Sequence, residues 1–259
     1  MFLPLQVDVP LRRLPWMNWV IIAVTIICFP LTVQWNGEFK PLGERWFLGS
    51  GYHYCVITHL FMHGNILHLL GNVYFLFLFG NAVCAKLGNF QYLVVYLGLG
   101  VCSSVDYLMS KQPAIGASGA IMGVVGMFVV WYFNNTISCL WVFWNFGDIE
   151  EVDAKWVVLI YLVFDLYGLM RHKEGDNVGY LAHIFGLAFG FCLAIILLKL
   201  KVVGMEEGEQ SLLDVTRGAP AKPRKKRRKK RSQTHAIPEF DPSQINKKSD
   251  SGGTITSGW

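Results

Sequence analysis

The sequence predicts an all-α polytopic membrane protein: a bundle of six transmembrane helices followed by a disordered basic C-terminal tail. Of its 259 residues, 53% are hydrophobic and only 16% are charged, whereas soluble domains carry about 25% charged residues. Residues 1–203 hold 11 basic against 11 acidic residues, while residues 204–259 hold 12 against 7. A nucleic-acid-binding domain would spread its basic charge over a folded face, so this distribution excludes that class and favours a membrane body with a soluble tail.

Six apolar segments are candidates for crossing the bilayer. A helix needs about 20 residues to cross the ~30 Å hydrocarbon layer, and only helices or closed barrels satisfy their backbone groups in lipid. No segment alternates as barrel strands do, which favours a helical bundle over residues 1–203. The first segment lacks a following small-residue cleavage site, so we expect an uncleaved helix. The segments are expected at residues 16–33, 62–80, 90–109, 114–133, 154–171 and 178–200.

The connections predict how the bundle is oriented. Residues 34–64 are rich in aromatic side chains, which suits either an interfacial segment or a packed re-entrant loop. Basic residues near the spans lie mainly on the side of the two termini, so both termini are expected in the cytoplasm and the protein in the cytoplasmic membrane of a bacterium. Those basic residues are Arg12, Arg13, Lys86, Lys155, Lys199 and Lys201.

The tail, residues 204–259, contains the run KPRKKRRKKR at residues 222–231. Such a run cannot fold on itself and is expected to be disordered. It is either simply solvated or attracted to anionic lipid headgroups, at about 1 kcal/mol per basic residue near the surface. The six cysteines are scattered without a C-x-x-C pair, so they predict neither a disulfide framework nor a metal site and are interpreted as small apolar core residues.

Three polar clusters lie inside the apolar spans, where polar groups are costly and therefore candidates for function. Ser118 begins the fourth span between two glycines, where free N–H groups of a helix start favour a nearby anion. His183 begins the sixth span and is followed by Gly186 and Gly190. The topology puts Ser118 and His183 in the same outer leaflet, and the small residues of both spans allow their helices to approach closely.

The third cluster lies in the second span and its approach. His68 and Asn72 are four residues apart and project from one helical face, as paired donors of an oxyanion hole do. His59 and His63 have the spacing of metal ligands, but position 60 is leucine and the segment has no carboxylate or thiolate. We therefore expect no metal and no cofactor.

The motifs HGNILHLLGN (63–72), GASG (116–119) and AHIFGLAFG (182–190) resemble those of the rhomboid family of intramembrane serine proteases. The order, the spacing and the six-helix layout agree over roughly residues 12–200. The resemblance implies a Ser–His dyad of Ser118 (nucleophile) and His183 (general base and acid). It also implies that His68, Asn72 and the Ser118 N–H hold the oxyanion, with a structural role for His63. The substrates would be transmembrane helices of other proteins.

Two positions depart from the family pattern. Many members have an aromatic residue four positions after the serine, where this chain has Met122, and many have Trp-Arg where this chain reads Tyr54-Cys55. Without the ring, orientation of His183 is left to packing. Asp106 and Asp165 also lie in spans, and we interpret them as partners for a helix end or a wet cavity rather than as a third catalytic residue.

Two other functions fit parts of the sequence. A catalytically inactive relative that binds membrane-protein clients would keep the fold, although such relatives typically lack the serine or the histidine. A small-solute transporter would show internal repeats or broken helices at mid-membrane, and neither pattern is visible.

Overall fold

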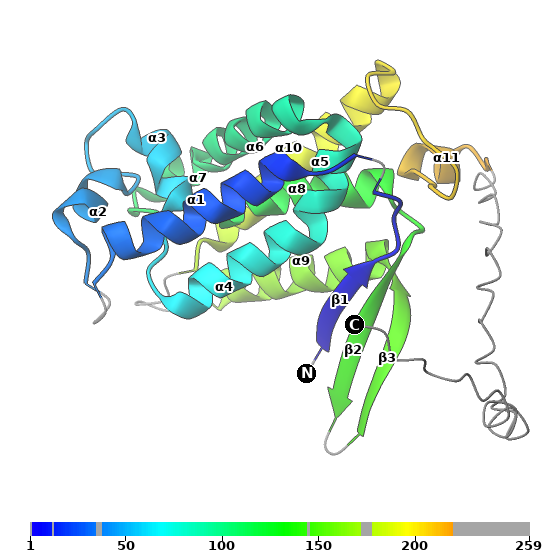
Figure 1. The fold of residues 1–259 in the computed structure, drawn as a ribbon, viewed down its shortest axis with the longest axis horizontal. Coiled ribbons are helices and arrows are strands. Elements are labelled where there is room, and N and C mark those ends of the chain that lie inside the picture. Colours follow the sequence, from blue (N-terminus) through cyan, green and yellow to red (C-terminus); the bar gives the residue numbers. More distant parts are fainter. Residues whose placement is uncertain (1, 12, 35–37, 144–145, 172–177, 220–259) are drawn as a thin grey trace, which may run out of the picture. The chain divides into compact units, whose positions relative to one another are not determined.

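The structure is a computed structural model that describes residues 2–11, 13–34, 38–143, 146–171 and 178–219 (Figure 1). Within these residues, each of the six predicted apolar segments forms a helix. The helices are α1 (Trp16–Thr32), the continuous run α4 (Ile66–Phe75), η2 (Leu76–Gly80) and α5 (Asn81–Leu87), α6 (Asn89–Ser103) with α7 (Val105–Ser110), α8 (Ser118–Trp131), α9 (Ala154–Met170) and α10 (Tyr180–Lys199).

Three of these helical runs are long and apolar enough to cross a membrane: Ile66–Leu87, Asn89–Met109 and Tyr180–Lys199. The helices α1 and α8 are apolar but shorter. Large apolar side chains also cover the outside of the bundle, as in Leu67 and Met170, which are 77% and 86% exposed. Apolar surface on this scale is uncommon on soluble monomers and matches a lipid environment.

The helix α8 forms the centre of the bundle. Every residue from Gly119 to Trp131 is buried, as expected for a helix that is apolar on all sides. It packs against α6, α9, α10 and the η2 turn. Because Ser118 is the first residue of α8, the position of the whole helix determines where this serine lies.

A polar network joins three of the other helices. The segment η2 is a turn of π-helix, and Leu76, its first residue, accepts a hydrogen bond at its carbonyl from Asn18 Nδ2 at 2.8 Å. Asn18 Nδ2 also donates to Asn81 Oδ1 at 2.9 Å, and Tyr92 donates its hydroxyl hydrogen to Asn18 Oδ1 at 2.7 Å. All polar atoms of the Asn18 side chain are thereby satisfied inside the bundle.

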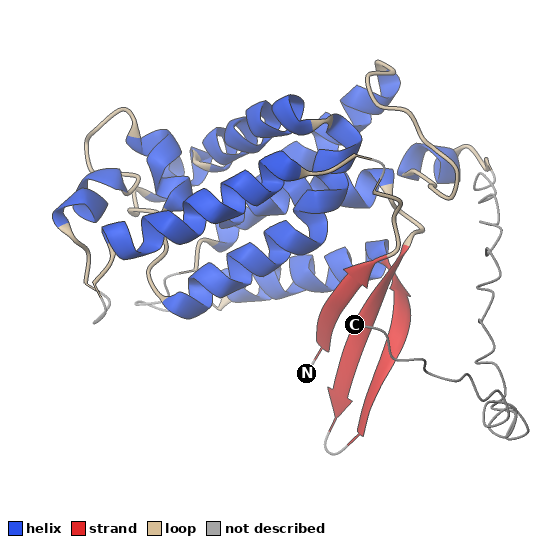
Figure 2. Cartoon of the chain, in the orientation of Figure 1, coloured by secondary structure: helices blue, strands red, loops and turns tan. Residues whose placement is uncertain are grey.

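A three-stranded antiparallel sheet corrects the all-α prediction (Figure 2). Its strands are β1 (Phe2–Val7), β2 (Thr136–Phe143) and β3 (Phe146–Asp153), in the order β1-β2-β3. The residues of β2 alternate, with Ile137 and Cys139 fully buried, and β-branched and aromatic residues are common in it. The prediction missed the pairing of β1 with β2 because these segments lie far apart in the sequence, and it overlooked the local signals of β2 and of its hairpin with β3.

The loop expected to be interfacial or re-entrant contains the short helices α2 (Pro41–Trp46), α3 (Cys55–Thr58) and η1 (His59–Phe61). At the other end of the chain, the prediction of a disordered tail from residue 204 is wrong for residues 204–219. These residues include α11 (Leu212–Thr216), which begins with a capping box made by Ser211 and Asp214.

The contact that the tail prediction overlooked is an ion pair. Glu209 is 4% exposed, and Lys86 Nζ donates to its Oε2 at 2.5 Å. Lys86 lies at the end of α5, so this pair attaches the first part of the predicted tail to the bundle. The polybasic run 222–231 lies outside the described residues.

Candidate active site

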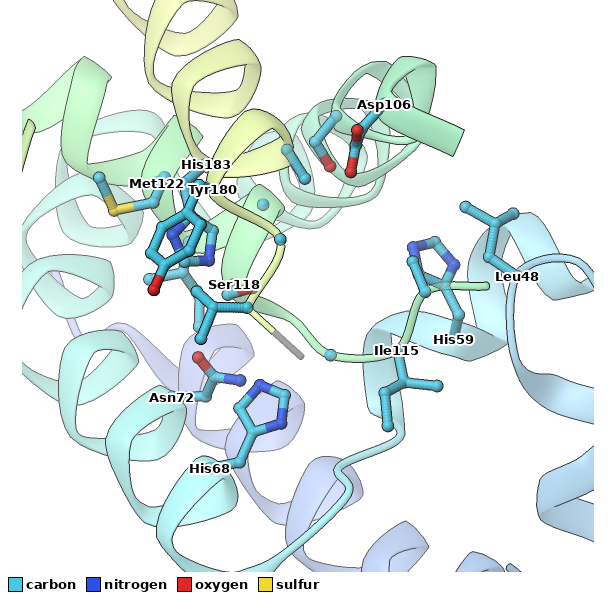
Figure 3. A pocket seen from close by; sticks show the side chains of 18 of the residues that line it. Leu48, His59, His68, Asn72, Asp106, Ile115, Ser118, Met122, Tyr180 and His183 are labelled. Carbon is cyan, nitrogen blue, oxygen red and sulfur yellow. The ribbon is translucent and has the colours of Figure 1, made fainter. Parts of the chain in front are cut away.

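A cavity of about 1550 Å³ opens into the bundle at the end where α8 and α10 begin (Figure 3). Its wall comes from α4, α7, α8, α9 and α10 and from the segment that precedes α8. The structure brings all four predicted site residues to this wall: His68, Asn72, Ser118 and His183.

The segment leading into α8 places Ser118 on the cavity wall. Gly116 has a φ of +112°, which glycine adopts at no steric cost, and a Cβ at this position would lie 2.8 Å from two atoms of the His68 ring. The first helical hydrogen bond of α8 is made by Ile121, whose N–H donates to Ala117 O at 3.0 Å. The N–H groups of the preceding residues, including Ser118, have no acceptor within the helix and favour a negative charge at this end.

Glycines bring α8 and α10 into backbone contact, as the sequence predicted. A Cβ on Gly186 would overlap the carbonyl oxygen of Gly119, and one on Gly190 would overlap the carbonyl oxygen of Gly123. His183 lies on α10 one turn before Gly186, and Ser118 directly precedes Gly119.

This contact places Ser118 and His183, the two predicted catalytic residues, at the cavity end of the closely packed helices α8 and α10. Among the hydrogen bonds of the described residues, none joins Ser118 Oγ to His183. Catalytic hydrogen bonds often form only when substrate binds, and both side chains line the same cavity.

The imidazole of His183 has a carboxylate partner, which the sequence analysis did not predict. His183 Nδ1 lies 3.0 Å from Asp165 Oδ1, and the two side chains are only 16% and 14% exposed. The expectation that packing alone orients His183 is therefore wrong. A signal was present in the sequence, because Asp165 is an acid in a predicted span and lies at the same predicted end of the bundle as His183.

His68 and Asn72 occupy one face of α4. Asn65 caps this helix by accepting the His68 N–H at 2.8 Å. Asn72 Nδ2 lies 2.7 Å from Nε2 of the fully buried His63 and donates one of its two hydrogens to it, while the rings of His63 and His68 are 4.9 Å apart. This contact fits the structural role expected for His63, and the second hydrogen of the Asn72 amide is left for another acceptor.

His59 holds the segment in front of Ser118. Its carbonyl accepts the Gly116 N–H at 2.9 Å, and its Nδ1 donates to Cys55 O at 2.8 Å. Burial lowers the pKa of His59 to about 4, because the charged imidazolium loses its hydration. His59 and His63 thus use ring nitrogens on protein partners, and no cluster of three or more metal-type ligands occurs among the described residues.

Met122, at the position where the resemblance to the rhomboid family implies an aromatic residue, lies on the cavity wall. It is 6% exposed and lines the same cavity as His183, one turn after Ser118. A thioether packs without the directional stacking of a ring. The carboxylate of Asp165, rather than an aromatic face, is thus the directional partner of this imidazole.

The arrangement has the parts needed for nucleophilic catalysis. A hydroxyl stands at a helix start, an imidazole lies on the neighbouring helix with a carboxylate behind it, and amide and imidazole donors lie on a third helix. These groups can activate a hydroxyl and stabilise an oxyanion.

The chain is similar in sequence to several known proteins. The chain is 26% identical over 196 residues to the rhomboid protein YdcA of Bacillus subtilis, covering 74% of this chain and 86% of that protein. It is 31% identical over 192 residues to Rhomboid protease GluP of Bacillus subtilis, covering 71% of this chain and 35% of GluP. It is also 26% identical over 223 residues to the mitochondrial RHOMBOID-like protein 6 of Arabidopsis thaliana, covering 74% of this chain and 68% of that relative.

The family model that describes the Rhomboid domain matches residues 50–200. This match includes the four site residues and the glycines between α8 and α10. The chain belongs to the rhomboid family.

Proposed function

We propose that the protein is an intramembrane serine endopeptidase that hydrolyses peptide bonds in or near transmembrane helices of other membrane proteins. The observation that carries the proposal is the convergence of Ser118, His183, His68 and Asn72 from three helices on one cavity. The names of several relatives, such as Rhomboid protease GluP, also support it.

In the proposed reaction, His183 removes the proton of Ser118 Oγ, and the oxygen attacks the carbonyl carbon of the substrate. His183 then gives this proton to the leaving amine, which produces an acyl-enzyme. A water molecule, deprotonated by His183, releases the second product and restores Ser118. No cofactor or metal takes part in this scheme.

The oxyanion would lie between the Ser118 N–H, His68 and the free hydrogen of the Asn72 amide. The His68 ring packs beside Gly116 and the His63 ring, and Asn72 is hydrogen-bonded to His63, so these contacts restrict both donors before substrate binds. Preorganised donors of this kind are typically worth about 3 kcal/mol each in a transition state.

The shape and lining of the cavity support a polypeptide substrate. Its volume of about 1550 Å³ exceeds the ~300–1000 Å³ typical of small-molecule sites. Apolar side chains from several elements, including Phe39, Phe75 and Leu169, surround the polar residues. Because a helix hides its carbonyls in i→i−4 bonds, the substrate must unwind locally, and residues with low helix propensity near the cut are expected to help.

The six helices would each cross the membrane, with both termini on the cytoplasmic side and the cavity toward the outside. The contact between Lys86 and Glu209 supports this arrangement, because it joins a basic residue of the predicted cytoplasmic side to the segment after the last helix. Attraction of residues 222–231 to anionic lipid is part of the same proposal.

A fluorophosphonate probe tests the nucleophile. We expect the purified wild-type protein to be labelled at Ser118 and to cut members of a panel of single-span substrates. S118A should lose labelling and lower the cleavage rate by at least about 10⁴-fold, because the nucleophile is gone. Ser138→Ala is the matched control, since Ser138 lies on β2 and is not among the residues lining the cavity.

Two outcomes would contradict the assignment. Labelling that persists in S118A would place the nucleophile elsewhere. Absence of labelling and cleavage in folded wild-type protein would favour the alternative of an inactive relative that binds membrane-protein clients.

A further inference from the structure

We propose that Asp165 is a positioning residue that holds His183 in the catalytic tautomer, so that this protein works with a Ser118–His183–Asp165 arrangement rather than a bare dyad. The inference rests on the proposed function and adds a third side chain to its machinery. It stands on the contact between Asp165 Oδ1 and His183 Nδ1 at 3.0 Å.

The contact determines which ring nitrogen carries the hydrogen. A carboxylate only accepts hydrogen bonds, so His183 Nδ1 must be the donor. The lone pair of the neutral ring is then on Nε2, the nitrogen left to receive the proton of Ser118. An imidazole without this partner would divide its population between two tautomers, of which only one is a base toward Ser118.

The face of α9 that meets the cavity places Asp165 for this task. Tyr161, Asp165 and Leu169 are spaced by four residues and all line the cavity. On the other side of the helix, Phe164 and Met170 are 62% and 86% exposed. The carboxylate is therefore the charged group on the stripe of α9 that lines the cavity.

Packing on both sides of Asp165 fixes the register of α9 against its neighbours. One turn before it, the ring of Tyr161 contacts the ring of Phe75 at a centroid distance of 5.0 Å. Three residues after it, a Cβ on Gly168 would overlap the ring of Tyr180. These contacts hold the carboxylate opposite the first turn of α10, where His183 lies.

The proton balance needs no additional reactant. The proton of Ser118 passes to His183 Nε2, which leaves an imidazolium whose Nδ1–H still points at the carboxylate. Asp165 stabilises this cation and keeps no proton, and Nε2 later delivers its proton to the leaving amine. Met122 on the cavity wall has no ring to stack on the imidazole, so the carboxylate is the directional contact that His183 has.

Asp165→Asn in the full-length protein tests the proposal. The amide can donate an N–H to Nδ1, which favours the tautomer that has its hydrogen on Nε2 and is not a base. With a substrate cleaved by the wild type, we expect kcat to fall by about 10²- to 10⁴-fold, as in hydrolases that lose the third residue, and KM to stay within about threefold. The rate of fluorophosphonate labelling should fall with kcat.

Two further variants make the test specific. Asp165→Glu keeps a carboxylate, so its kcat should be at least about tenfold higher than that of D165N. If D165N does not fold, D165E can still be compared with the wild type. Asp148→Asn removes a carboxylate of β3 that is not among the residues lining the cavity, and it should keep kcat within about threefold.

A spectroscopic measurement separates positioning from simple structural support. The ¹⁵N chemical shifts of His183, assigned by comparison with H183A, should show hydrogen on Nδ1 in the wild type and a shift toward the Nε2–H form in D165N. A tether between helices would change thermal stability without selecting a tautomer.

The failures of this inference and of the proposed function are distinguishable. If S118A is inactive while D165N keeps the wild-type kcat, the positioning role is wrong and the serine mechanism stands. A drop in kcat that D165E does not relieve, or an Nε2–H tautomer in the wild type, would also overturn the positioning role. If the wild type is neither labelled nor active, the proposed function itself fails.

Discussion

The helices α8 and α9 form two walls of the same cavity, and they are held in very different ways. Every residue of α8 from Gly119 to Trp131 is buried, whereas in α9 only Ala154, Val157 and Val158 among the described residues are buried. The backbone of α8 touches α10 through glycines. The cavity half of α9 is attached by separate side-chain contacts, one of which is the hydrogen bond from His183 to Asp165.

This difference shows how the side chains of the candidate site are positioned. In lipid, apolar surface gives little drive for helix association, so close packing and polar contacts must position the helices. Steric fit on α8 fixes Ser118, while α9 is positioned by the packing of Tyr161 and Gly168 and contributes one polar contact, from Asp165 to His183. A change on α8 should therefore act through folding, and a change at Asp165 should act through the chemistry.

The largest effect is expected from a matched pair of phenylalanines. Phe128 on α8 is fully buried, with its ring 5.0 Å from that of Phe79, whereas Phe164 on α9 is 62% exposed. Phe128→Ala should lower the free energy of unfolding by about 3–5 kcal/mol, because it opens a cavity in the core. Phe164→Ala should change it by less than about 0.5 kcal/mol.

Reversible unfolding in mixed micelles measures both variants. Similar losses from the two substitutions would contradict the contrast between the walls, because they would mean that α9 is packed as firmly as α8.

A glycine substitution at the contact of α8 with α10 should have the next largest effect. A Cβ on Gly190 would overlap the Gly123 carbonyl, so Gly190→Ala should separate the helices and cost about 2–3 kcal/mol of stability. It should also lower kcat by at least about tenfold, because a displacement of about 1 Å between catalytic groups can cost 10²-fold.

Gly98→Ala is the matched control on α6, since a Cβ there would meet nothing within 4 Å. It should leave stability unchanged or raise it by up to about 1 kcal/mol, through its better helix propensity. Thermal denaturation and the cleavage assay compare the two. Tolerance of alanine at position 190 would show that the helices are not in backbone contact.

The smallest effect for a single change, here a change of one pH unit, concerns the segment in front of Ser118. The pKa of His59 is lowered to about 4, so the unfolded chain binds a proton below about pH 6.5 that the folded protein does not bind until about pH 4. The contribution of His59 is therefore complete above pH 6.5 and falls between pH 6.5 and 4, by roughly 1 kcal/mol per pH unit. Unfolding midpoints measured from pH 7 to 4 should fall less steeply in His59→Gln, and equal slopes would refute the assignment.

Local patterns in the sequence determine most of the helical architecture. The apolar segments at 90–109 and 178–200 match α6–α7 and α10 closely, because a lipid-facing helix must be apolar over its whole length. The glycines at 119, 123, 186 and 190 predict the contact of α8 with α10, since close approach requires small residues on both helices. The sequence motifs also point to all four residues that meet in the cavity.

Contacts between distant segments were not predictable in this way. The strand β1 pairs with β2, and Glu209 binds Lys86. In both contacts, the sequence around one partner does not indicate the other partner. Predicting the pairing of β1 and the folded start of the tail would have required knowing which distant segments of the chain lie together.

The sequence alone determined the helices, the two that touch and the side chains available for chemistry, because periodicity, length and residue size act over short distances. Only the tertiary structure decided that Asp165 faces His183. That pairing depends on the rotation and register of α9 against α10, which arise from the packing of Tyr161 and Gly168 on other helices. A carboxylate in an apolar span indicates that a polar partner is present. Which residue is that partner depends on how the helices pack.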